Sequence, residues 1–275
     1  MPNRFVAFAE RLADTAAGMI DAHRAQPPAA TVKADKSLVT ELDLAIERCL
    51  RGMIEQQFPD HGILGEEFEA KNRDAEWVWV LDPIDGTAAF VAGMTVYSTL
   101  IALAHCQRPV LGVMHFPATG ERWLGVAGQP TRLNGEPCQT RAGESLADAI
   151  QSTSSPDFFS TGPELRVLQA LSQQTAWRIY GGAAMSYGRL ASGRTDIALD
   201  AGLKIHDYAA FVPVIEGAGG VISDWQGQAL TLLSGPTILA AGDPRRHAAA
   251  LVLIDAALQD DGAAPQMSFN RKSEI

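Results

Sequence analysis

The most constraining feature of this chain is an apolar segment that ends in two acids. Residues 79–81 are Trp-Val-Leu, and they run directly into Asp82, Pro83, Ile84, Asp85, Gly86 and Thr87. The apolar residues favour a buried strand, and the proline and glycine favour a turn at its end. Two carboxylates, a backbone carbonyl and a hydroxyl within one turn are oxygen ligands that Mg²⁺ prefers beside a substrate phosphate. The same residues also suit a capped turn, so this segment alone leaves both interpretations open.

The size and charge of the chain exclude several classes of protein. With 275 residues, 47% of them hydrophobic, the chain is near the length at which one core becomes two. A formal net charge of −10 argues against non-specific nucleic-acid binding, and an anionic substrate would need bound metal at its site. The three cysteines fit neither a disulfide framework nor a zinc spacing, and no apolar run has the length of a signal core or a membrane span. We therefore expect a cytoplasmic protein with reduced thiols that binds neither membranes nor nucleic acid.

Hydrophobic periodicity predicts a mixture of helices and strands. Helices are expected at 4–24, after Thr40, near 87–92, and at 163–174, 183–192, 206–218 and 244–258. Strands are expected at 77–81, 96–104, 110–116, 121–126, 177–180, 196–200, 220–223 and 236–241. Polar, turn-rich residues at 128–145 suggest a boundary between an N-terminal α+β subdomain (1–140), with most candidate ligands, and a C-terminal α/β subdomain (141–260). Residues 261–275 are expected to form a frayed tail.

Three further acids are candidates for the same chemistry. Glu66 follows a short apolar segment at 62–65, Asp43 lies in the first turn of the helix after Thr40, and Asp207 lies at the start of a predicted helix. An acid near a helix N-terminus commonly caps the helix, so Asp43 and Asp207 also have a purely structural interpretation. The glycines within 217–220 let a helix approach a strand closely, which restricts where Asp207 can point.

Taken together, these segments resemble the inositol monophosphatase superfamily. Four motifs occur in the same order: Lys33-x-x-x-Ser37-x-Val39-Thr40-x-x-Asp43, Gly65-Glu66-Glu67, the segment from Asp82 to Thr87, and Asp207-x-Ala209-Ala210 followed by residues 216–220. The resemblance covers about residues 30–230. It implies the layered αβαβα sandwich of the sugar phosphatases, of mixed α+β and α/β class, and a homodimer.

The resemblance also implies a metal site. One Mg²⁺ would bind Glu66, Asp82 and the carbonyl of Ile84, and a second would bind Asp82, Asp85 and Asp207. A third, weaker ion would use Glu66, and Mn²⁺ could replace Mg²⁺. Two ions about 4 Å apart can hold the attacking and leaving oxygens of an in-line displacement.

Catalytic and substrate-binding residues follow from the same resemblance. Thr87 would orient the attacking water, Asp43 would accept a hydrogen bond from Thr87, and Glu66 would belong to the same catalytic group. Lys33 would stabilise its loop or the third ion. The phosphate monoester would contact Asp85, Gly86, Thr87, Gly181, Gly182, Ala183 and Asp200.

Several substrates remain open at this point. L-Histidinol phosphate is the first expectation, because residues 212–220 and other segments resemble histidinol-phosphate phosphatases and Asp200 suits a cationic amine. A polyol hydroxyl can donate to the same carboxylate, and Ala183-Ala184 is more similar to inositol phosphatases, so myo-inositol 1-phosphate or a related sugar phosphate comes second. Adenosine 3′,5′-bisphosphate is third. A non-enzymatic binding relative with a vestigial site is a fourth alternative, which the complete set of candidate ligands disfavours.

Overall fold

The fold is seen in a computed structural model that describes residues 3–25, 29–33 and 38–260. Its helices are α1 (Asn3–His23), α2 (Glu41–Gln57), α3 (Thr87–Val91), α4 (Gly162–Gln174), α5 (Met185–Ala191), α6 (Ile205–Tyr208), α7 (Phe211–Gly217) and α8 (Pro244–Gln259), with a 3-10 turn at Pro156–Phe158. A short antiparallel pair, β1 (Ala30–Val32) and β2 (Leu38–Thr40), precedes α2. The predicted tail at 261–275 and Ser37 of the first motif lie outside the described residues.

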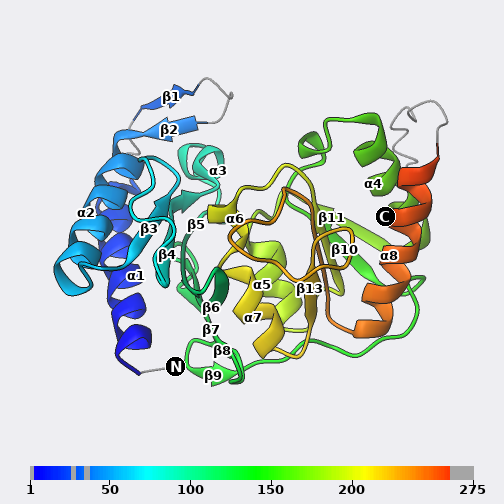
Figure 1. The fold of residues 1–275 in the computed structure, drawn as a ribbon. Helices are drawn as coiled ribbons and strands as arrows, with labels where there is room; N and C mark the ends of the chain where they lie inside the picture. The colour runs from blue at the N-terminus through cyan, green and yellow to red at the C-terminus, as the bar shows by residue number, and fades with distance from the viewer. Residues whose placement is uncertain (1–2, 26–28, 34–37, 261–275) are drawn as a thin grey trace.

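Two sheets organise the chain (Figure 1). The larger has the order β3 (Gly62–Gly65), β4 (Trp77–Asp85), β5 (Ser98–His105), β6 (Arg108–Phe116), β7 (Glu121–Val126), β8 (Arg132–Leu133) and β9 (Glu136–Pro137). The smaller has the order β11 (Trp177–Tyr180), β10 (Ile150–Thr153), β12 (Ile197–Asp200), β14 (Ile238–Ala241) and β13 (Val221–Ser223). The sheets fall on either side of the proposed boundary near residue 140, and the division into subdomains stays a prediction.

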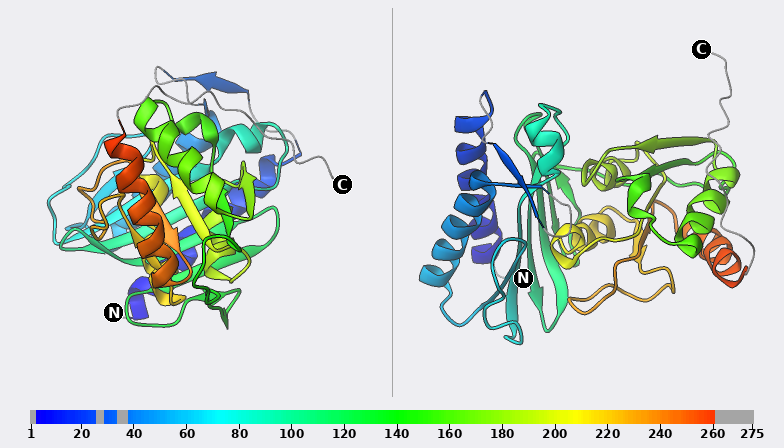
Figure 2. Two further views of the ribbon diagram at one scale, coloured as in Figure 1. Left: turned by 90° about the vertical axis from the view of Figure 1, so that its right-hand side faces the viewer. Right: turned by 90° about the horizontal axis from the view of Figure 1, so that it is seen from above.

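Helices and sheets alternate as five layers, as the view from above shows (Figure 2). The apolar faces of α1 and α2 pack on one face of the larger sheet, in a core that includes Leu12, Ile46 and Trp79. The opposite face packs on α5 and α7, and a third core joins α4 and α8 to the smaller sheet. This is the αβαβα sandwich that the sequence predicted.

The predicted elements are mostly present, with two informative differences. The strand β10 was not predicted, because its sequence Ile-Gln-Ser-Thr has few apolar residues even though Gln151, Ser152 and Thr153 are buried. The single helix expected at 206–218 is divided into α6 and α7. Pro213 has no N–H to donate to the carbonyl of residue 209, so a continuous helix would lose a hydrogen bond at that point.

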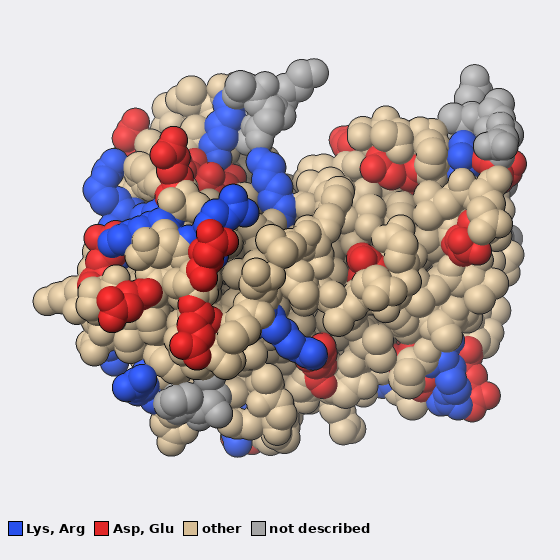
Figure 3. Space-filling model, viewed as in Figure 1, with Lys and Arg blue, Asp and Glu red and all other residues tan. Residues whose placement is uncertain are grey.

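Among the described residues, no helix combines the length and hydrophobicity that crossing a membrane would require. Figure 3 shows acidic and basic side chains interspersed over the N-terminal part of one face, while much of the C-terminal part carries few charges. For the described residues on this face, the picture contains no broad basic surface of the kind that nucleic-acid binding uses. A cytoplasmic location stays a prediction.

Candidate active site

A β-bulge at the end of β4 brings two acids to the same face of the sheet. Side chains three positions apart in a regular strand point to opposite faces. Here Asp82 pairs with Leu100 and Asp85 with Ser98, so two residues of β4 oppose one residue of β5. Ile84 consequently joins the core under α1 and α2, while Asp82 and Asp85 face the other way. The proline at position 83 is tolerated because a bulge leaves it out of the hydrogen-bond ladder.

Close helix–sheet packing brings Asp207 to the same place. A Cβ atom on Gly112 would lie 2.2 Å from the carbonyl oxygen of Ala210, and one on Gly125 would lie 2.4 Å from Pro213. Only glycine therefore allows α7 to lie this close to β6 and β7. The glycines at 217–220 were expected to control this approach, and Gly217 does pack tightly on Thr131, but Gly112 and Gly125 lie under the helix itself.

The acids form a compact cluster. Carboxylate oxygens of Asp82, Asp85 and Asp207 lie within 4.8 Å of one another, and so do ligand atoms of Glu66, Asp82 and His206. Asp82 is only 2% exposed, and its Oδ1 atom has no hydrogen-bond partner among the described residues. Burial raises the pKa of Asp82, of Asp85 to about 6 and of Asp207 to about 8, and neighbouring acids add to the effect. An orphaned buried oxygen among like charges fits a site built for a cation.

Two residues in this cluster have additional partners. Asp85 Oδ2 accepts hydrogen bonds from Ser98 Oγ and the backbone N–H of Ala184, both at 3.1 Å. Asp207 Oδ2 accepts from the N–H of Lys204 at 2.6 Å. These bonds fix one oxygen of each carboxylate and orient the residue toward the cluster.

Lys33 lies against the acids that follow β3. Its Nζ donates to Glu66 Oε1 at 2.9 Å and to Glu67 Oε1 at 2.7 Å. Burial raises the pKa of Glu67 to about 7, which Lys33 opposes by its hydrogen bond and charge. The lysine is therefore paired with the acids of the site.

Thr87 and Asp43 are hydrogen-bonded, as the sequence led us to expect. The Thr87 hydroxyl lies 3.1 Å from Asp43 Oδ1 and also 3.1 Å from the carbonyl oxygen of Ile84. Asp43 is fully buried, and its other oxygen accepts from the backbone N–H and hydroxyl of Thr40 in a capping box at the start of α2. Burial raises the pKa of Asp43. Asp43 thus caps a helix and holds Thr87 at the same time.

A cavity of about 590 Å³ opens onto this cluster. Its lining includes most of the predicted site residues, which are Glu66, Asp82, Ile84, Asp85, Gly86, Thr87, Gly181, Ala183 and Asp207. It also includes residues that the sequence did not single out for a role, namely Ser154, Phe158, Lys204, His206 and Phe211. His206 directly precedes Asp207 in the sequence, and an imidazole next to a candidate ligand was the available signal.

Two predicted substrate contacts do not reach this cavity. Gly182 is absent from its lining and packs on Ser186, whose Oγ would lie 2.4 Å from an added Cβ. Asp200 is fully buried, and its carboxylate accepts hydrogen bonds from Ser154 Oγ and Tyr187 Oη, both at 2.9 Å. Burial raises its pKa to about 7. In this structure Asp200 holds Ser154 at the cavity wall and does not itself line the cavity, contrary to the role that the sequence suggested.

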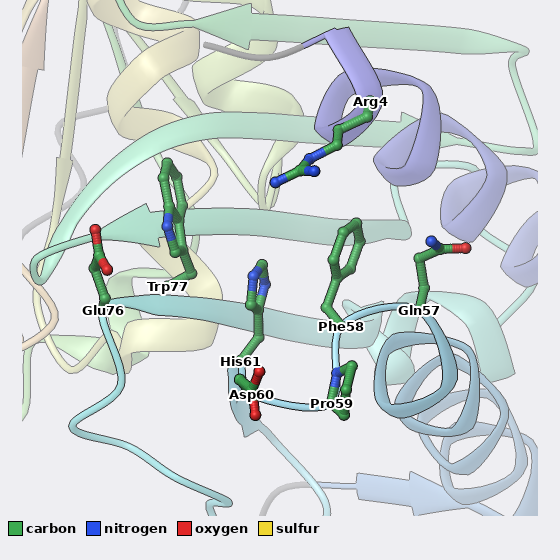
Figure 4. A pocket seen from close by; sticks show the side chains of 8 residues that line it. All are labelled: Arg4, Gln57, Phe58, Pro59, Asp60, His61, Glu76 and Trp77. Atoms are coloured by element: carbon green, nitrogen blue, oxygen red, sulfur yellow. The ribbon is translucent and has the colours of Figure 1, made fainter.

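A second cavity, of about 370 Å³, has a different character. Figure 4 shows the rings of Trp77, His61 and Phe58 standing side by side in it, with Arg4 reaching toward them. His61 Nδ1 accepts a hydrogen bond from the indole of Trp79 at 3.1 Å, and burial lowers its pKa. Both candidate metal-binding groups of the described residues lie in the larger cavity instead.

Comparison with known proteins agrees with this geometry. Residues 1–259 match the inositol monophosphatase family. The chain belongs to this family. It is 38% identical over 258 residues to the bifunctional phosphatase IMPL2, chloroplastic, of Arabidopsis thaliana, covering 90% of this chain and 74% of that protein. It is 33% identical over 218 residues to a histidinol-phosphatase of Chlorobaculum parvum, and the match covers 77% of this chain and 81% of that protein.

A solved inositol monophosphatase from Zymomonas mobilis has the same fold. It superposes with a TM-score of 0.84 at 40% identity, over 92% of this chain and 98% of that one. As a member of the inositol monophosphatase family, the protein is a metal-dependent phosphatase that hydrolyses small-molecule phosphate monoesters. The vestigial, non-enzymatic alternative is set aside.

Proposed function

We propose that the protein is a Mg²⁺-dependent phosphatase of L-histidinol phosphate, releasing L-histidinol and phosphate. The observation that carries the proposal is the cluster of Asp82, Asp85 and Asp207 on the wall of a substrate-sized cavity. Two to three Mg²⁺ ions would be held by Glu66, Asp82, Asp85, Asp207 and the carbonyl of Ile84, and Mn²⁺ is a possible substitute. When bound, these ions neutralise the charge of the acids and of the phosphate and act as a Lewis acid.

The residues around the acids have separate tasks in this proposal. The Thr87 hydroxyl, held by Asp43, accepts a hydrogen bond from the attacking water and so orients it toward phosphorus. Backbone N–H groups of Gly86 and Thr87 bind phosphate oxygens. Lys33 restrains Glu66 through their 2.9 Å contact. On the leaving-group side, Gly181 and Ala183 offer backbone groups.

The choice of histidinol phosphate rests on the apolar residues of the cavity lining. Phe158, Phe211 and Leu203 present apolar surface there, which suits an imidazole ring better than a polyol. The similarity to the histidinol-phosphatase of Chlorobaculum parvum points the same way. Myo-inositol 1-phosphate is the second candidate, because the Zymomonas mobilis protein of 40% identity is an inositol monophosphatase. A homodimer is proposed as the assembly.

Phosphate release from a panel of esters tests the substrate. The panel contains histidinol phosphate, inositol 1-phosphate, fructose 1,6-bisphosphate and adenosine 3′,5′-bisphosphate, each assayed with Mg²⁺ and with EDTA. We expect the highest kcat/KM for histidinol phosphate and no turnover with EDTA. A higher kcat/KM for inositol 1-phosphate would replace the first candidate by the second.

A further inference from the structure

His206 is a buried residue of the larger cavity that has no role in the proposed function. It lines this cavity with 9% of its surface exposed, and it directly precedes the candidate ligand Asp207. Both residues lie on α6, which packs against β4 and β5. The N–H of Lys204 donates to Asp207 Oδ2 at 2.6 Å, which fixes the first turn of α6. The imidazole is thereby held beside the acids at the end of β4.

The acids and His206 form two overlapping groups of candidate ligands. One group is Glu66, Asp82 and His206. The other is Asp82, Asp85 and Asp207. Asp82 belongs to both groups, so they define two neighbouring cation positions that share a carboxylate. The first position offers a nitrogen together with oxygens, whereas the second offers carboxylate oxygens only.

The spacing of the first group suits direct coordination. Bonds from a divalent metal to nitrogen or oxygen are about 2.0–2.2 Å long, so ligands on opposite sides of one ion are about 4.2 Å apart. The ligand atoms of Glu66, Asp82 and His206 all lie within 4.8 Å of one another, so small side-chain adjustments let them bind one ion. Asp82 Oδ1 is buried with no hydrogen-bond partner among the described residues. His206 Nε2 lies 3.7 Å from Asp207 Oδ1, which places the imidazole beside both groups.

We propose that His206 is a metal ligand that forms, with Glu66 and Asp82, a cation position that prefers a divalent transition metal to Mg²⁺. Mg²⁺ takes oxygen ligands, whereas imidazole binds divalent transition metals well. The neighbouring all-oxygen position has no such donor and suits Mg²⁺. The centre is therefore built for two unlike ions, and His206 decides which ion the first position selects.

The role of His206 deepens the proposed function and rests on its cation site. In that function Glu66 and Asp82 hold a Mg²⁺ ion, and a nitrogen donor beside them changes the ion that this position selects. A histidine that only hydrogen-bonded to one of the acids would lie outside the coordination shell. Direct ligation and hydrogen bonding therefore predict different spectra for a bound paramagnetic ion.

Pulsed EPR of the full chain with bound Mn²⁺, and without substrate, tests direct ligation. A ¹⁴N nucleus bonded to Mn²⁺ modulates the spin echo strongly, and a more distant imidazole does so only weakly. The wild type should show the strong modulation. His206→Phe, which keeps a ring without nitrogen, should lose it, whereas Asp85→Asn changes only the all-oxygen position and should keep it. A wild-type spectrum without directly bonded ¹⁴N would overturn the proposal.

Isotope labelling repeats this test without any substitution, so it does not depend on the folding of a variant. In the described part of the chain, His206 is the only histidine in a candidate ligand group. Wild-type protein grown with ¹⁵N-histidine should therefore replace the ¹⁴N modulation by that of ¹⁵N. If the ¹⁴N modulation remained unchanged, the bound nitrogen would not come from histidine and the proposal would fail.

Isothermal titration calorimetry tests the preference for a transition metal, with Co²⁺ and Mg²⁺ as the probes. His206→Phe should raise the Kd of Co²⁺ at the mixed position by at least about tenfold, and the Kd of Mg²⁺ by less than about threefold. His105→Phe, at a partly exposed histidine outside the cavity, is the matched control and should leave both Kd values unchanged. An equal loss of affinity for both ions in His206→Phe would contradict the preference.

These measurements use no substrate, so a failure here is distinct from a failure of the proposed function. Mg²⁺-dependent phosphate release by a chain whose Mn²⁺ has no directly bonded ¹⁴N would overturn the role of His206 and leave the proposed function intact. Conversely, the ¹⁴N modulation together with inactivity on every ester of the panel would support the metal ligand and contradict the proposed function.

Discussion

Two buried aspartates in this molecule, Asp196 and Asp82, have opposite electrostatic surroundings. Asp196 is fully buried, and it accepts hydrogen bonds from Arg141, Arg246 and the N–H of Ile150. Asp82 is almost as buried, yet one of its oxygens has no partner among the described residues and its neighbours are acids. Burial alone would raise both pKa values, but the arginines outweigh it and lower the pKa of Asp196.

The difference separates a structural acid from a functional one. Asp196 receives its counter-charges from the fold, so it ties Arg141 and α8 to the smaller sheet. Asp82 receives none from the described residues, and in the proposed function a bound cation would supply the missing counter-charge. Replacing Asp82 by asparagine should therefore lower activity without lowering stability. Replacing Asp196 by asparagine should lower stability without lowering activity.

The largest expected effect is on activity at Asp82. Asp82→Asn should lower kcat/KM at least about a thousandfold, because several kcal/mol of metal-assisted charge stabilisation are lost. The metal-free variant should be at least as stable as the wild type, since a buried charge is removed. Glu216→Gln, which alters a partly exposed acid paired with Arg108, is the matched control and should retain activity. Near wild-type turnover of Asp82→Asn would remove Asp82 from the site.

Substitution of the other aspartate, Asp196, should lower the stability of the fold. Asp196→Asn leaves Arg141 without its ion-pair partner and the buried Arg246 with only the exposed Asp148, which should lower the free energy of unfolding by about 3–5 kcal/mol in urea titration. Asp148→Asn, at the exposed partner of Arg246, should cost at most about 1 kcal/mol. The folded Asp196→Asn protein should keep its kcat. If it lost kcat instead, the distinction between the two aspartates would not hold.

A smaller effect is expected at Thr87. Thr87→Ala should lower kcat by about a hundredfold with a smaller change in KM, because the hydroxyl acts on the attacking water. Thr87→Ser keeps the hydroxyl and should recover most of the activity. Steady-state kinetics distinguish the cases, and a change in KM alone would contradict the assigned role.

The stabilisation of the protein by Mg²⁺ should differ between variants of the two aspartates. Mg²⁺ at 100 times its Kd should stabilise the wild type by about 2.7 kcal/mol. Thermal denaturation with and without EDTA should show this stabilisation in Asp196→Asn and not in Asp82→Asn. Equal Mg²⁺ effects in both variants would mean that the acids do not form the cation site.

The smallest effect concerns pH in the metal-free protein. The pKa of Asp85 is raised to about 6 and that of Asp207 to about 8, so between pH 5 and 8 the folded state binds more protons than the unfolded state. Stability in EDTA should therefore fall as pH rises, by up to about 1.4 kcal/mol per pH unit for each titrating group. Asp207→Asn should reduce this slope. The lowered pKa of Asp196 contributes stability that is lost only at more acidic pH, so Asp196→Asn should keep the slope.

By itself, the sequence determined the elements and the family. Periodicity located most helices and strands, and the motifs from Asp43 to Asp207 identified the acids that the fold brings together as candidate ligands, because side-chain chemistry and local spacing can be read from the sequence. The Thr40 cap and the Thr87–Asp43 pair were also predictable.

Tertiary structure decided the details that depend on distant contacts. A bulge turned Asp82 and Asp85 to one face, and Gly112 and Gly125 admitted α7 close enough to bring Asp207 beside them. Asp200 does not line the cavity, and its carboxylate accepts hydrogen bonds from Ser154 and Tyr187. Asp196 is paired with two arginines that lie 55 and 50 positions away in the sequence. Whether a buried carboxylate is satisfied depends on which residues surround it in space, and no local pattern in the sequence records that.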